Sequence, residues 1–406
     1  METHRFLMVS THYPPQHLGG DAIFVKYLSE ELIKRGHDVH VMYNPTAYQM
    51  LRKPKKAPPS AIDDNGPVRH PFVSSTGRLD PLLALTFGRW GGAKRKLDSL
   101  VKDLLPDVVH WHNTRGFIGR PYSFPGRISL YTNHDYTPIC PRSNLLKPDL
   151  SPCNDPRWCT ICCMKWGKPP HLWRVGKRRV LRYDEGLKLL APSQFMANRF
   201  RTEGVVVHRV LRLFVPDLAD RYTRSDSVQD SIVYLGLLER HKGIQTLFDA
   251  FVESKDRQGF RLHMIGEGSM KEGLRRQAEQ WKLTNRLQIP GYLSRDAVEN
   301  IRKDAVAQVV PSIWYENAPS TAVEALSLGV PVIASDIGGL PEMVTADSGS
   351  ETFPAGDVHE LADLLVRFWD ERNKLEARRG KARTTYETKF RPEIHIAEYL
   401  NTIKAM

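Results

Sequence analysis

Two glutamates, Glu316 and Glu324, stand eight positions apart in the second half of the chain. An apolar run at 306–310 is typical of a buried strand, and the residues at 322–328 predict a helix. Glu316 would therefore lie just outside a helix N-terminus, and Glu324 about one turn inside the helix. Carboxylates in these places could accept hydrogen bonds from the hydroxyls of a sugar. The alternative is a pair of solvated charges at a helix end.

The segment between the two glutamates is suited to bind an anion. Ser320 or Thr321 is predicted to cap the helix, because both side chains accept hydrogen bonds at that position. The backbone amides of Asn317, Ala318, Ser320 and Thr321 would then point into one opening. Free amides and the helix dipole both favour negative charge there. The stretch thus predicts an anion site with a carboxylate on each side.

A histidine and an aspartate, His134 and Asp135, follow a predicted strand at 127–131. Ligands of open parallel sheets bind beyond the carboxyl ends of the strands. A histidine there could hydrogen-bond a sugar hydroxyl or transfer a proton, because its pKa is near neutral. The alternative is a structural histidine whose hydrogen bonds are satisfied within the protein. A second predicted strand, 107–113, carries His112 towards the same edge.

All five cysteines of the chain lie within 24 residues, at positions 140, 153, 159, 162 and 163. The first four have the spacing C-x12-C-x5-C-x2-C, and C-x2-C is the usual pair of a four-thiolate zinc site. Clustering in an otherwise cysteine-free intracellular chain favours a metal over disulfides. A structural zinc on Cys140, Cys153, Cys159 and Cys162 is therefore predicted, holding a long loop. Disulfides, unliganded thiols and an iron–sulfur cluster are the alternatives.

The elements that must position these residues alternate between strands and helices in both halves. The first half begins with a strand at 6–9, a loop with Gly19 and Gly20, and a helix at 22–34. These glycines could let the backbone approach a phosphate, but the G-x-G-x-x-G pattern is absent, which argues against an NAD enzyme. The alternation restarts at residue 231, so each half is predicted to be α/β with a parallel sheet.

The predicted boundaries follow this alternation. They are an N-terminal domain at 1–214 with a cysteine-rich loop at 140–163, a linker at 215–230, a C-terminal domain at 231–390, and a last helix at 391–406 that packs back towards the N-terminal domain.

The net charge of +12 is concentrated in the first half. Residues 1–215 hold 33 Lys and Arg against 17 Asp and Glu, a net charge of +16, whereas the rest holds 25 against 29, a net charge of −4. Basic surfaces attract nucleic acid, anionic lipid or phosphorylated substrates. No nucleic-acid-binding motif accompanies the charge, so nucleic acid is not expected as a partner.

Apolar residues at 84–90 beside Lys94, Arg95 and Lys96 would suit peripheral contact with an anionic membrane, although buried helix packing is the alternative. No apolar run reaches about 18 residues, so no transmembrane helix is expected. The apolar segment near the N-terminus is too short for a signal peptide, and a cytoplasmic location is expected.

Together these segments resemble glycosyltransferase family 4. Glu316 and Glu324 match the E-x7-E motif of retaining GT-B glycosyltransferases, and further matches follow in the family's order along nearly the whole chain. They are Tyr13-Pro14-Pro15, Gly19-Gly20, Arg35-Gly36-His37, Asp107-Val108-Val109-His110, His134-Asp135, Pro192-Ser193, Lys242-Gly243, Gly266-Glu267-Gly268, Pro311-Ser312, Glu324-Ala325-Leu326, Gly329-Val330-Pro331 and Gly338-Gly339-Leu340-Pro341-Glu342. The stretch from His134 to the later cysteines resembles a subgroup with a cysteine-rich loop.

The resemblance implies a GT-B fold, with two Rossmann-like domains facing a cleft. The C-terminal domain would bind the nucleotide-sugar and the N-terminal domain the acceptor. By resemblance Glu324 holds the ribose and Glu316 and His134 lie by the donor sugar. Lys242 neutralises the leaving diphosphate, so no catalytic metal is needed. The donor side would also include Asn317, Ala318, Pro319, Ser320, Arg240, Gly20 and Gly266, and the acceptor side would include His112, Asp135 and Gly19.

The chain departs from the family at Leu237, where an arginine usually follows the first strand of the second domain. The site then lacks a second cation for the diphosphate, unless Arg240 or Arg212 replaces it. A charge-assisted contact of this kind is worth roughly 1.5–3 kcal/mol. The expected activity is retaining transfer of a hexose or hexosamine from a UDP- or GDP-sugar to a glycan or lipid-linked acceptor. A sugar-phosphate isomerase or phosphorylase-like enzyme, and a catalytically weakened binding module, are the alternatives.

Overall fold

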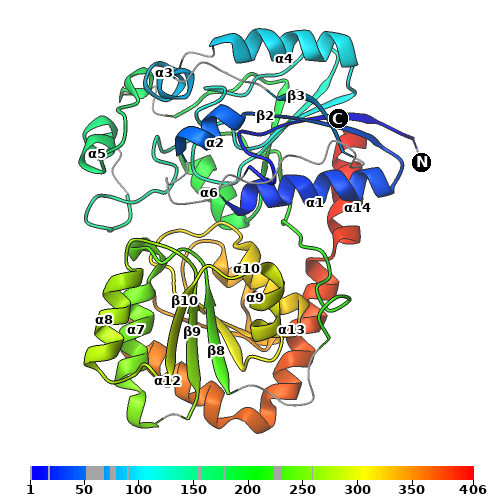
Figure 1. The fold of residues 1–406 in the computed structure, drawn as a ribbon. Coiled ribbons are helices and arrows are strands. Elements are labelled where there is room, and N and C mark those ends of the chain that lie inside the picture. The colour runs from blue at the N-terminus through cyan, green and yellow to red at the C-terminus, as the bar shows by residue number, and fades with distance from the viewer. Residues whose placement is uncertain are drawn as a thin grey trace. The chain divides into compact units, whose positions relative to one another are not determined.

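The structure is a computed structural model, and it describes residues 2–16, 19–51, 68–73, 79–88, 91–153, 158–176, 180–223, 230–257 and 259–406. The chain divides into two compact units (Figure 1). Unit 1 comprises Met1–Leu213 and His395–Met406, and unit 2 comprises Phe214–Ile394. Each unit is built around its own sheet.

In the described residues, the sheet of unit 1 has the strand order β3-β2-β1-β4-β5-β6-β7, and all of its pairings are parallel. The strand order reverses between β1 and β4, which makes their carboxyl ends the expected place for a ligand. The elements are β1 (Arg5–Val9), α1 (Gly20–Lys34), β2 (Asp38–Tyr43), α2 (Pro45–Leu51), β3 (Arg69–Val73), α3 (Asp80–Phe87), α4 (Gly91–Leu104), β4 (Val108–Trp111), β5 (Ile128–Thr132), α5 (Cys159–Lys165), η1 (Leu172–Arg174), β6 (Leu187–Ala191), α6 (Gln194–Thr202) and β7 (Arg209–Val210).

Helices cover both faces of this sheet, with α4 on one side and α1 and α14 (Pro392–Lys404) on the other (Figure 1). Trp111 of β4 packs against Tyr122, whose hydroxyl donates to Asp98 of α4 at 2.7 Å. His110, the preceding residue, points the other way and bonds Tyr399 of α14 at 2.8 Å. Burial on both faces explains why the strands are nearly continuous apolar runs instead of alternating ones.

The sheet of unit 2 has the order β10-β9-β8-β11-β12-β13 in the described residues, again with parallel pairings. Here the order reverses between β8 and β11. The elements are β8 (Ser231–Leu235), η3 (Arg240–Lys242), α7 (Ile244–Glu253), η4 (Lys255–Arg257), β9 (Arg261–Ile265), α8 (Lys271–Gln280), β10 (Leu287–Gly291), α9 (Arg295–Arg302), β11 (Ala307–Val310), α10 (Ser320–Ser327), β12 (Val332–Ser335), α11 (Leu340–Met343), η5 (Ala346–Ser348), β13 (Glu351–Phe353), α12 (Val358–Asp370), η6 (Arg372–Lys374) and α13 (Leu375–Lys389).

Two apolar cores lie on the two faces of this second sheet. Ile232 and Tyr234 of β8 belong to the core shared with α7, α8 and α12, whereas Val233 belongs to the core shared with α10 and α13. Figure 1 shows α7 and α8 on one side of the strands and α10 and α13 on the other. The period-2 alternation of strand side chains therefore builds both layers. The predicted α/β class, with a parallel sheet in each half, is confirmed.

No helix within the described ranges is long and apolar enough to cross a membrane. The predicted apolar segment at 84–90 falls partly on α3, and residues 89–90 lie outside the described part of the chain.

Candidate active site

The loops that follow β8 and β11 meet at the edge of the unit 2 sheet. The two strands are parallel neighbours, with Tyr234 paired to Val309, so their carboxyl ends lie together. The loop after β8 contains η3, and the loop after β11 leads into α10. The backbone amide of Ile313 donates to the carbonyl of His241 at 3.1 Å and joins the two loops.

Gly243 allows this close approach. It ends η3 with a φ of +66°, and a Cβ atom at this position would collide with the carbonyl oxygen of Pro311. Only glycine combines a positive φ at little cost with the absence of a side chain. The Lys242-Gly243 pair therefore brings the lysine next to the loop that carries Glu316.

Glu316 is buried, with 5% of its surface exposed. Its Oε1 accepts hydrogen bonds from Lys242 Nζ at 2.7 Å, from Ser312 Oγ at 2.6 Å and from Trp314 Nε1 at 2.7 Å. Burial alone would raise the pKa of this carboxyl, but the charge and hydrogen bond of Lys242, together with the other two donors, hold the pKa below its usual value. Glu316 is therefore a carboxylate at neutral pH.

Helix α10 begins beside this carboxylate. Its cap residue is Pro319, and no side chain hydrogen-bonds to the cap, so the predicted cap at Ser320 or Thr321 is wrong. Proline has a fixed φ suited to a helix start but offers no side-chain acceptor. The amides of the first helical turn therefore donate to no side-chain cap. An anion site at a helix start requires such amides. Ala318, Pro319 and Ser320 are half-buried, and Asn317 is buried.

Glu324 lies within α10 in a network of charges. Its Oε1 accepts from Arg295 Nη1 at 3.0 Å, and its Oε2 accepts from Arg302 Nη1 and Nη2, both at 3.1 Å. Arg302 is fully buried and also bonds Glu299. Oε2 thus already accepts two hydrogen bonds, whereas Oε1 accepts one and keeps a lone pair to which a hydroxyl donor can bind.

Five residues of these two clusters escaped the sequence reasoning: Ser312, Trp314, Arg295, Glu299 and Arg302. Ser312 and Trp314 lie in the same loop as Glu316, four and two positions before it, and this closeness in the sequence is the available signal. Arg302 carried only the i, i+3 spacing from Glu299 on one helix. Nothing in the sequence placed that helix against Glu324, because the contact depends on how α9 packs onto α10.

The remaining donor-side residues lie on the loops after β8 and β9. Gly266 has a φ of +149°, and a Cβ there would collide with the carbonyl oxygen of Gly236, so glycine is required where these loops touch. Arg240 is exposed on η3. Leu237, at the position of the family's arginine, is also exposed, and its carbonyl accepts a hydrogen bond from the Tyr234 hydroxyl at 2.7 Å.

The predicted residues of unit 1 gather at the carboxyl ends of β1, β4 and β5. Gly19 caps α1 and Gly20 begins it, and both are exposed. His112 Nδ1 and His134 Nε2 lie 3.0 Å apart in hydrogen-bonding contact. Asp135 accepts a hydrogen bond from the amide of Thr137 at 2.8 Å, which is the geometry of a turn-forming aspartate. The structure thus brings His112 and His134 together and gives Asp135 a local bond in the turn.

The five cysteines line one cavity of about 280 Å³ in unit 1, with Arg142 and Trp158 also on its wall. They form no disulfide with one another. Among the described residues, no group of three or more His, Cys, Asp or Glu side chains is placed to hold a metal ion. Zinc on Cys140, Cys153, Cys159 and Cys162 stays a prediction, which metal analysis of the purified chain would test.

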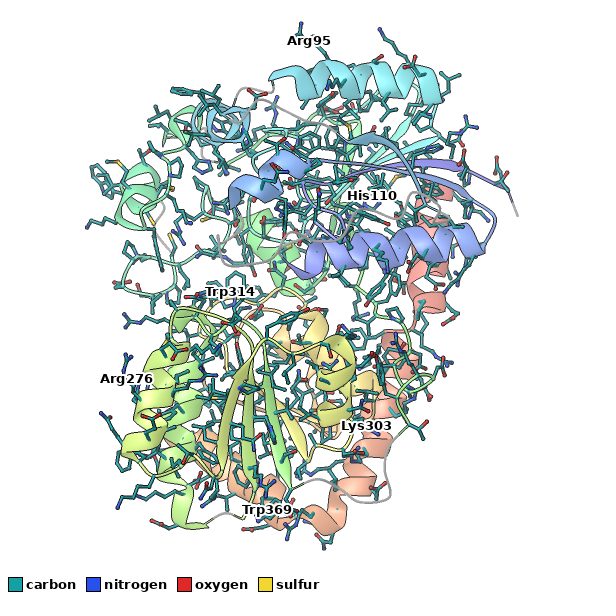
Figure 2. All side chains as sticks on the ribbon, in the orientation of Figure 1. Arg95, His110, Arg276, Lys303, Trp314 and Trp369 are labelled. Carbon is teal, nitrogen blue, oxygen red and sulfur yellow. The ribbon has the colours of Figure 1, made fainter. Side chains whose placement is uncertain are left out.

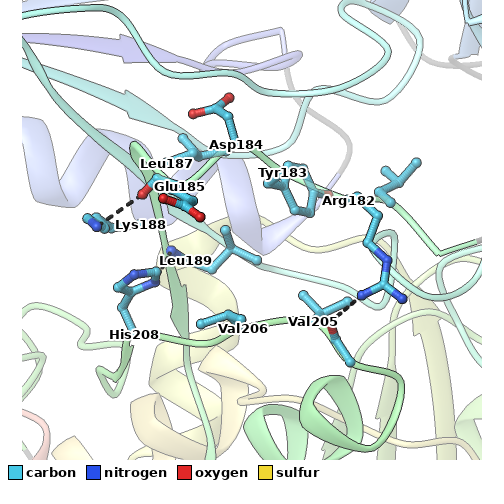
Figure 3. Close-up of a pocket in the computed structure, with 12 residues that line it drawn as sticks. Arg182, Tyr183, Asp184, Glu185, Leu187, Lys188, Leu189, Val205, Val206 and His208 are labelled. Carbon is cyan, nitrogen blue, oxygen red and sulfur yellow. Dashed lines mark hydrogen bonds between the residues drawn. The ribbon is translucent and has the colours of Figure 1, made fainter.

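A second cavity of unit 1, of about 290 Å³, lies beside β6 (Figure 3). Tyr183, Lys188 and His208 are among its lining residues, and Leu189 donates its amide to His208 Nδ1 at 3.2 Å. This cavity contains none of the residues that the sequence predicted for the site, so cavity size alone does not identify the reaction centre.

The chain matches the models of two protein families, one after the other along the sequence. Residues 18–211 match "Glycosyltransferase Family 4", and residues 220–385 match "Glycosyl transferases group 1". An uncharacterized glycosyltransferase of Methanocaldococcus jannaschii is 25% identical over 355 residues, which cover 84% of this chain and 82% of that protein. The glycogen synthase of Mycobacterium tuberculosis is 25% identical over 407 residues, covering 95% and 91%. The chain belongs to glycosyltransferase family 4, and it is a glycosyltransferase.

Solved structures show the same fold. Sucrose-phosphate synthase from Thermosynechococcus elongatus superimposes with a TM-score of 0.69 at 17% identity, covering 99% of this chain and 98% of that one. Anabaena HepE, solved in complex with UDP and glucose, has a TM-score of 0.66 at 16% identity, covering 99% and 100%. The fold is therefore GT-B, as the sequence predicted.

Proposed function

We propose that this enzyme is a retaining glycosyltransferase that moves a hexose or hexosamine from a UDP- or GDP-sugar to a glycan or lipid-linked acceptor. The anomeric carbon loses its bond to a diphosphate oxygen and gains a bond to an acceptor oxygen on the same face of the sugar. The acceptor proton passes to the leaving diphosphate. No catalytic metal takes part, because a lysine, backbone amides and a helix N-terminus balance the charge of the diphosphate.

The observation that carries the proposal is the contact between Lys242 and Glu316 at the start of α10. A cation, a buried carboxylate and the amides of a helix start meet at the edge of the sheet where strand order reverses. A diphosphate attracts the lysine and the amides, while the carboxylate suits sugar hydroxyls. The names of two similar proteins support the proposal: a putative colanic acid biosynthesis glycosyltransferase of Escherichia coli, and Anabaena HepE, a structural neighbour solved in complex with UDP-glucose.

The test is a panel of UDP- and GDP-sugars incubated with simple glycan and lipid-linked acceptors. We expect acceptor-dependent release of nucleotide diphosphate from one donor, unchanged by a chelator of divalent cations. Proton NMR of the product should show the anomeric configuration of the donor. Inversion of that configuration would contradict the retaining mechanism, and donor binding without any transfer would favour the sugar-phosphate isomerase or the binding module.

The proposal of a lipid-linked acceptor rests on the exposed apolar face of α3. Leu82, Leu83 and Phe87 are exposed there, whereas Pro81 and Ala84 are buried against unit 1. The indole of Trp173 donates to the carbonyl of Leu85 at 3.0 Å and anchors the helix. The following helix, α4, carries Lys94, Arg95 and Lys96, and Figure 2 shows Arg95 directed outward. Apolar side chains beside lysines and arginines suit the surface of an anionic membrane, where a lipid-linked acceptor would lie.

The double change Leu83→Glu with Phe87→Glu is expected to weaken co-sedimentation with phosphatidylglycerol-containing vesicles by roughly tenfold or more, since each buried apolar side chain contributes about 1.5–3 kcal/mol. Val206, exposed elsewhere in unit 1, gives the control Val206→Glu, which should bind like the wild type. Equal vesicle binding by the double variant and the wild type would remove α3 from the membrane contact.

A further inference from the structure

A row of buried rings lies behind His134 in unit 1. His110 is in β4 and His112 two residues later, so both side chains lie on the same face of the sheet, and each is at most 1% exposed. Their ring centres are 4.1 Å apart. His134 follows the neighbouring strand β5, in the register that pairs His110 with Leu130. Figure 2 shows His110 inside unit 1.

His110 is held on both sides of its ring. Its Nε2 lies 2.8 Å from Thr132 Oγ1 and its Nδ1 lies 2.8 Å from the Tyr399 hydroxyl. Each partner is a hydroxyl that can donate or accept, so a neutral ring is satisfied whichever nitrogen carries the proton. His110 therefore needs no hydrogen bond from His112, and its ring packs against that of His112 with the two planes tilted by 39°. Burial lowers the pKa of His110 well below its usual value, so this neighbour is neutral.

Within the described residues, the ring of His112 has one hydrogen-bond partner. Its Nδ1 faces His134 Nε2 at 3.0 Å, and its Nε2 is buried with no hydrogen-bond partner in the described part of the chain. A buried N–H without an acceptor is rarer and costlier than a buried lone pair without a donor. The proton of neutral His112 thus belongs on Nδ1, from which it donates to His134. His134 Nε2 must then be the acceptor, and the proton of neutral His134 lies on Nδ1.

The surroundings keep both rings neutral at physiological pH. Burial lowers the pKa of His112 well below its usual value, and the neighbouring histidines lower it further. Burial also lowers the pKa of His134, although Asp21 and Asp135 oppose the shift. The titratable groups that face the pair are His110 on β4, Asp21 on α1, Asp135 after β5, and His395 and Tyr399 on α14.

We propose that His112 is a positioning residue that fixes His134 in the Nδ1–H tautomer, so that His134 donates a hydrogen bond to a sugar hydroxyl instead of acting as a base. The part that concerns the sugar rests on the proposed function. The tautomer itself is a property of the ligand-free protein. His112 was predicted to lie on the acceptor side. Its ring is fully buried, and the hydrogen bond that it makes among the described residues is to His134.

The test is long-range proton–nitrogen NMR of the histidine rings in the ligand-free full chain, with the His134 signals assigned from His134→Gln. We expect neutral His134 with the proton on Nδ1. In His112→Leu, which removes the donor, that signature should change to the other tautomer or to a mixture, and kcat/KM should fall about tenfold. His112→Asn places an amide donor near the former Nδ1 and should recover most of the activity.

Two controls separate this role from general support of the fold. Tyr399→Phe removes the bond to His110 and leaves the His112–His134 pair, so it should leave the His134 tautomer unchanged. A wild-type spectrum with the proton of His134 on Nε2, or with a charged His134 at neutral pH, would overturn the proposal. If the spectrum shows the expected tautomer but the protein transfers sugar from none of the donors, the assignment of the tautomer is kept. That result would contradict only the proposed function.

Discussion

Replacing Lys242 by methionine is expected to lower kcat/KM for the sugar donor by about 10²- to 10³-fold, the usual loss when one electrostatic contact to a developing oxyanion is removed. Nζ of Lys242 lies 2.7 Å from Glu316 Oε1 and 4.8 Å from the centre of the Trp314 ring, so the lysine is already held in place before a donor arrives. Methionine keeps most of the side-chain length and removes the charge. Initial rates of release of the nucleoside diphosphate measure the effect.

The same change leaves Glu316 without its cation. Burial then raises the pKa of Glu316 with only Ser312 and Trp314 to oppose it. The lowered pKa of the wild type stabilises the fold above the unfolded pKa of about 4.3, and this contribution is lost as the pH falls through the folded pKa. We therefore expect Lys242→Met to cost about 1–3 kcal/mol at pH 7, and less as the medium is acidified. Urea unfolding at several pH values measures the difference.

Two further variants separate the catalytic effect from the structural one. Adding Glu316→Gln to Lys242→Met removes the unpaired charge, so the free energy of unfolding should recover while the activity does not. Lys303, whose Nζ donates to the carbonyl of Thr223 at 2.6 Å in the same unit, gives the control Lys303→Met. A Lys242→Met enzyme that is destabilised but retains kcat/KM within threefold would mean that the lysine only supports Glu316.

The parallel sheets could be predicted because helices cover both faces of each sheet, and this burial leaves an apolar pattern in the strands. Strands covered on both faces are continuous apolar runs, as Phe6–Val9 shows with four fully buried side chains. Glycines such as Gly243 mark points where two loops touch, and they helped to place Lys242. The family resemblance placed Lys242 and Glu316 at the donor site. Their direct contact follows from the adjacency of β8 and β11 in the sheet, which was not predicted from the sequence.

What the sequence could not supply was the set of partners of each charged residue. The bonds from Arg295 and Arg302 to Glu324 join residues 29 and 22 positions apart, and they depend on how two helices pack. The bond between His112 and His134 depends on the register of β4 and β5. The predicted cap of α10 failed for a local reason, since serine and threonine followed Pro319, which itself occupies the cap position.

Replacing Arg302 by methionine is expected to lower the free energy of unfolding by about 3–5 kcal/mol, the range for breaking a buried ion pair by removing one partner. Arg302 and Glu299 are both fully buried, and Glu324 is 4% exposed. The guanidinium donates to Glu299 at 2.5–2.8 Å and to Glu324 at 3.1 Å. Methionine fills similar space, so most of the loss comes from two buried carboxylates that lose their buried cation and keep only the partly exposed Arg295. Urea unfolding monitored by tryptophan fluorescence measures it.

Arg276, which Figure 2 shows pointing away from α8, gives the matched control Arg276→Met, expected within about 0.5 kcal/mol of the wild type. Adding Glu299→Gln to Arg302→Met should restore a large part of the stability, since one of the two buried carboxylates that lost Arg302 is then replaced by a neutral amide. Glu324 keeps its bond to Arg295, whose side chain is 42% exposed and can move with a bound donor. If Arg302→Met instead unfolds like the wild type, the three buried charges are not coupled in solution, and Arg302 does not hold Glu324 in position for the ribose.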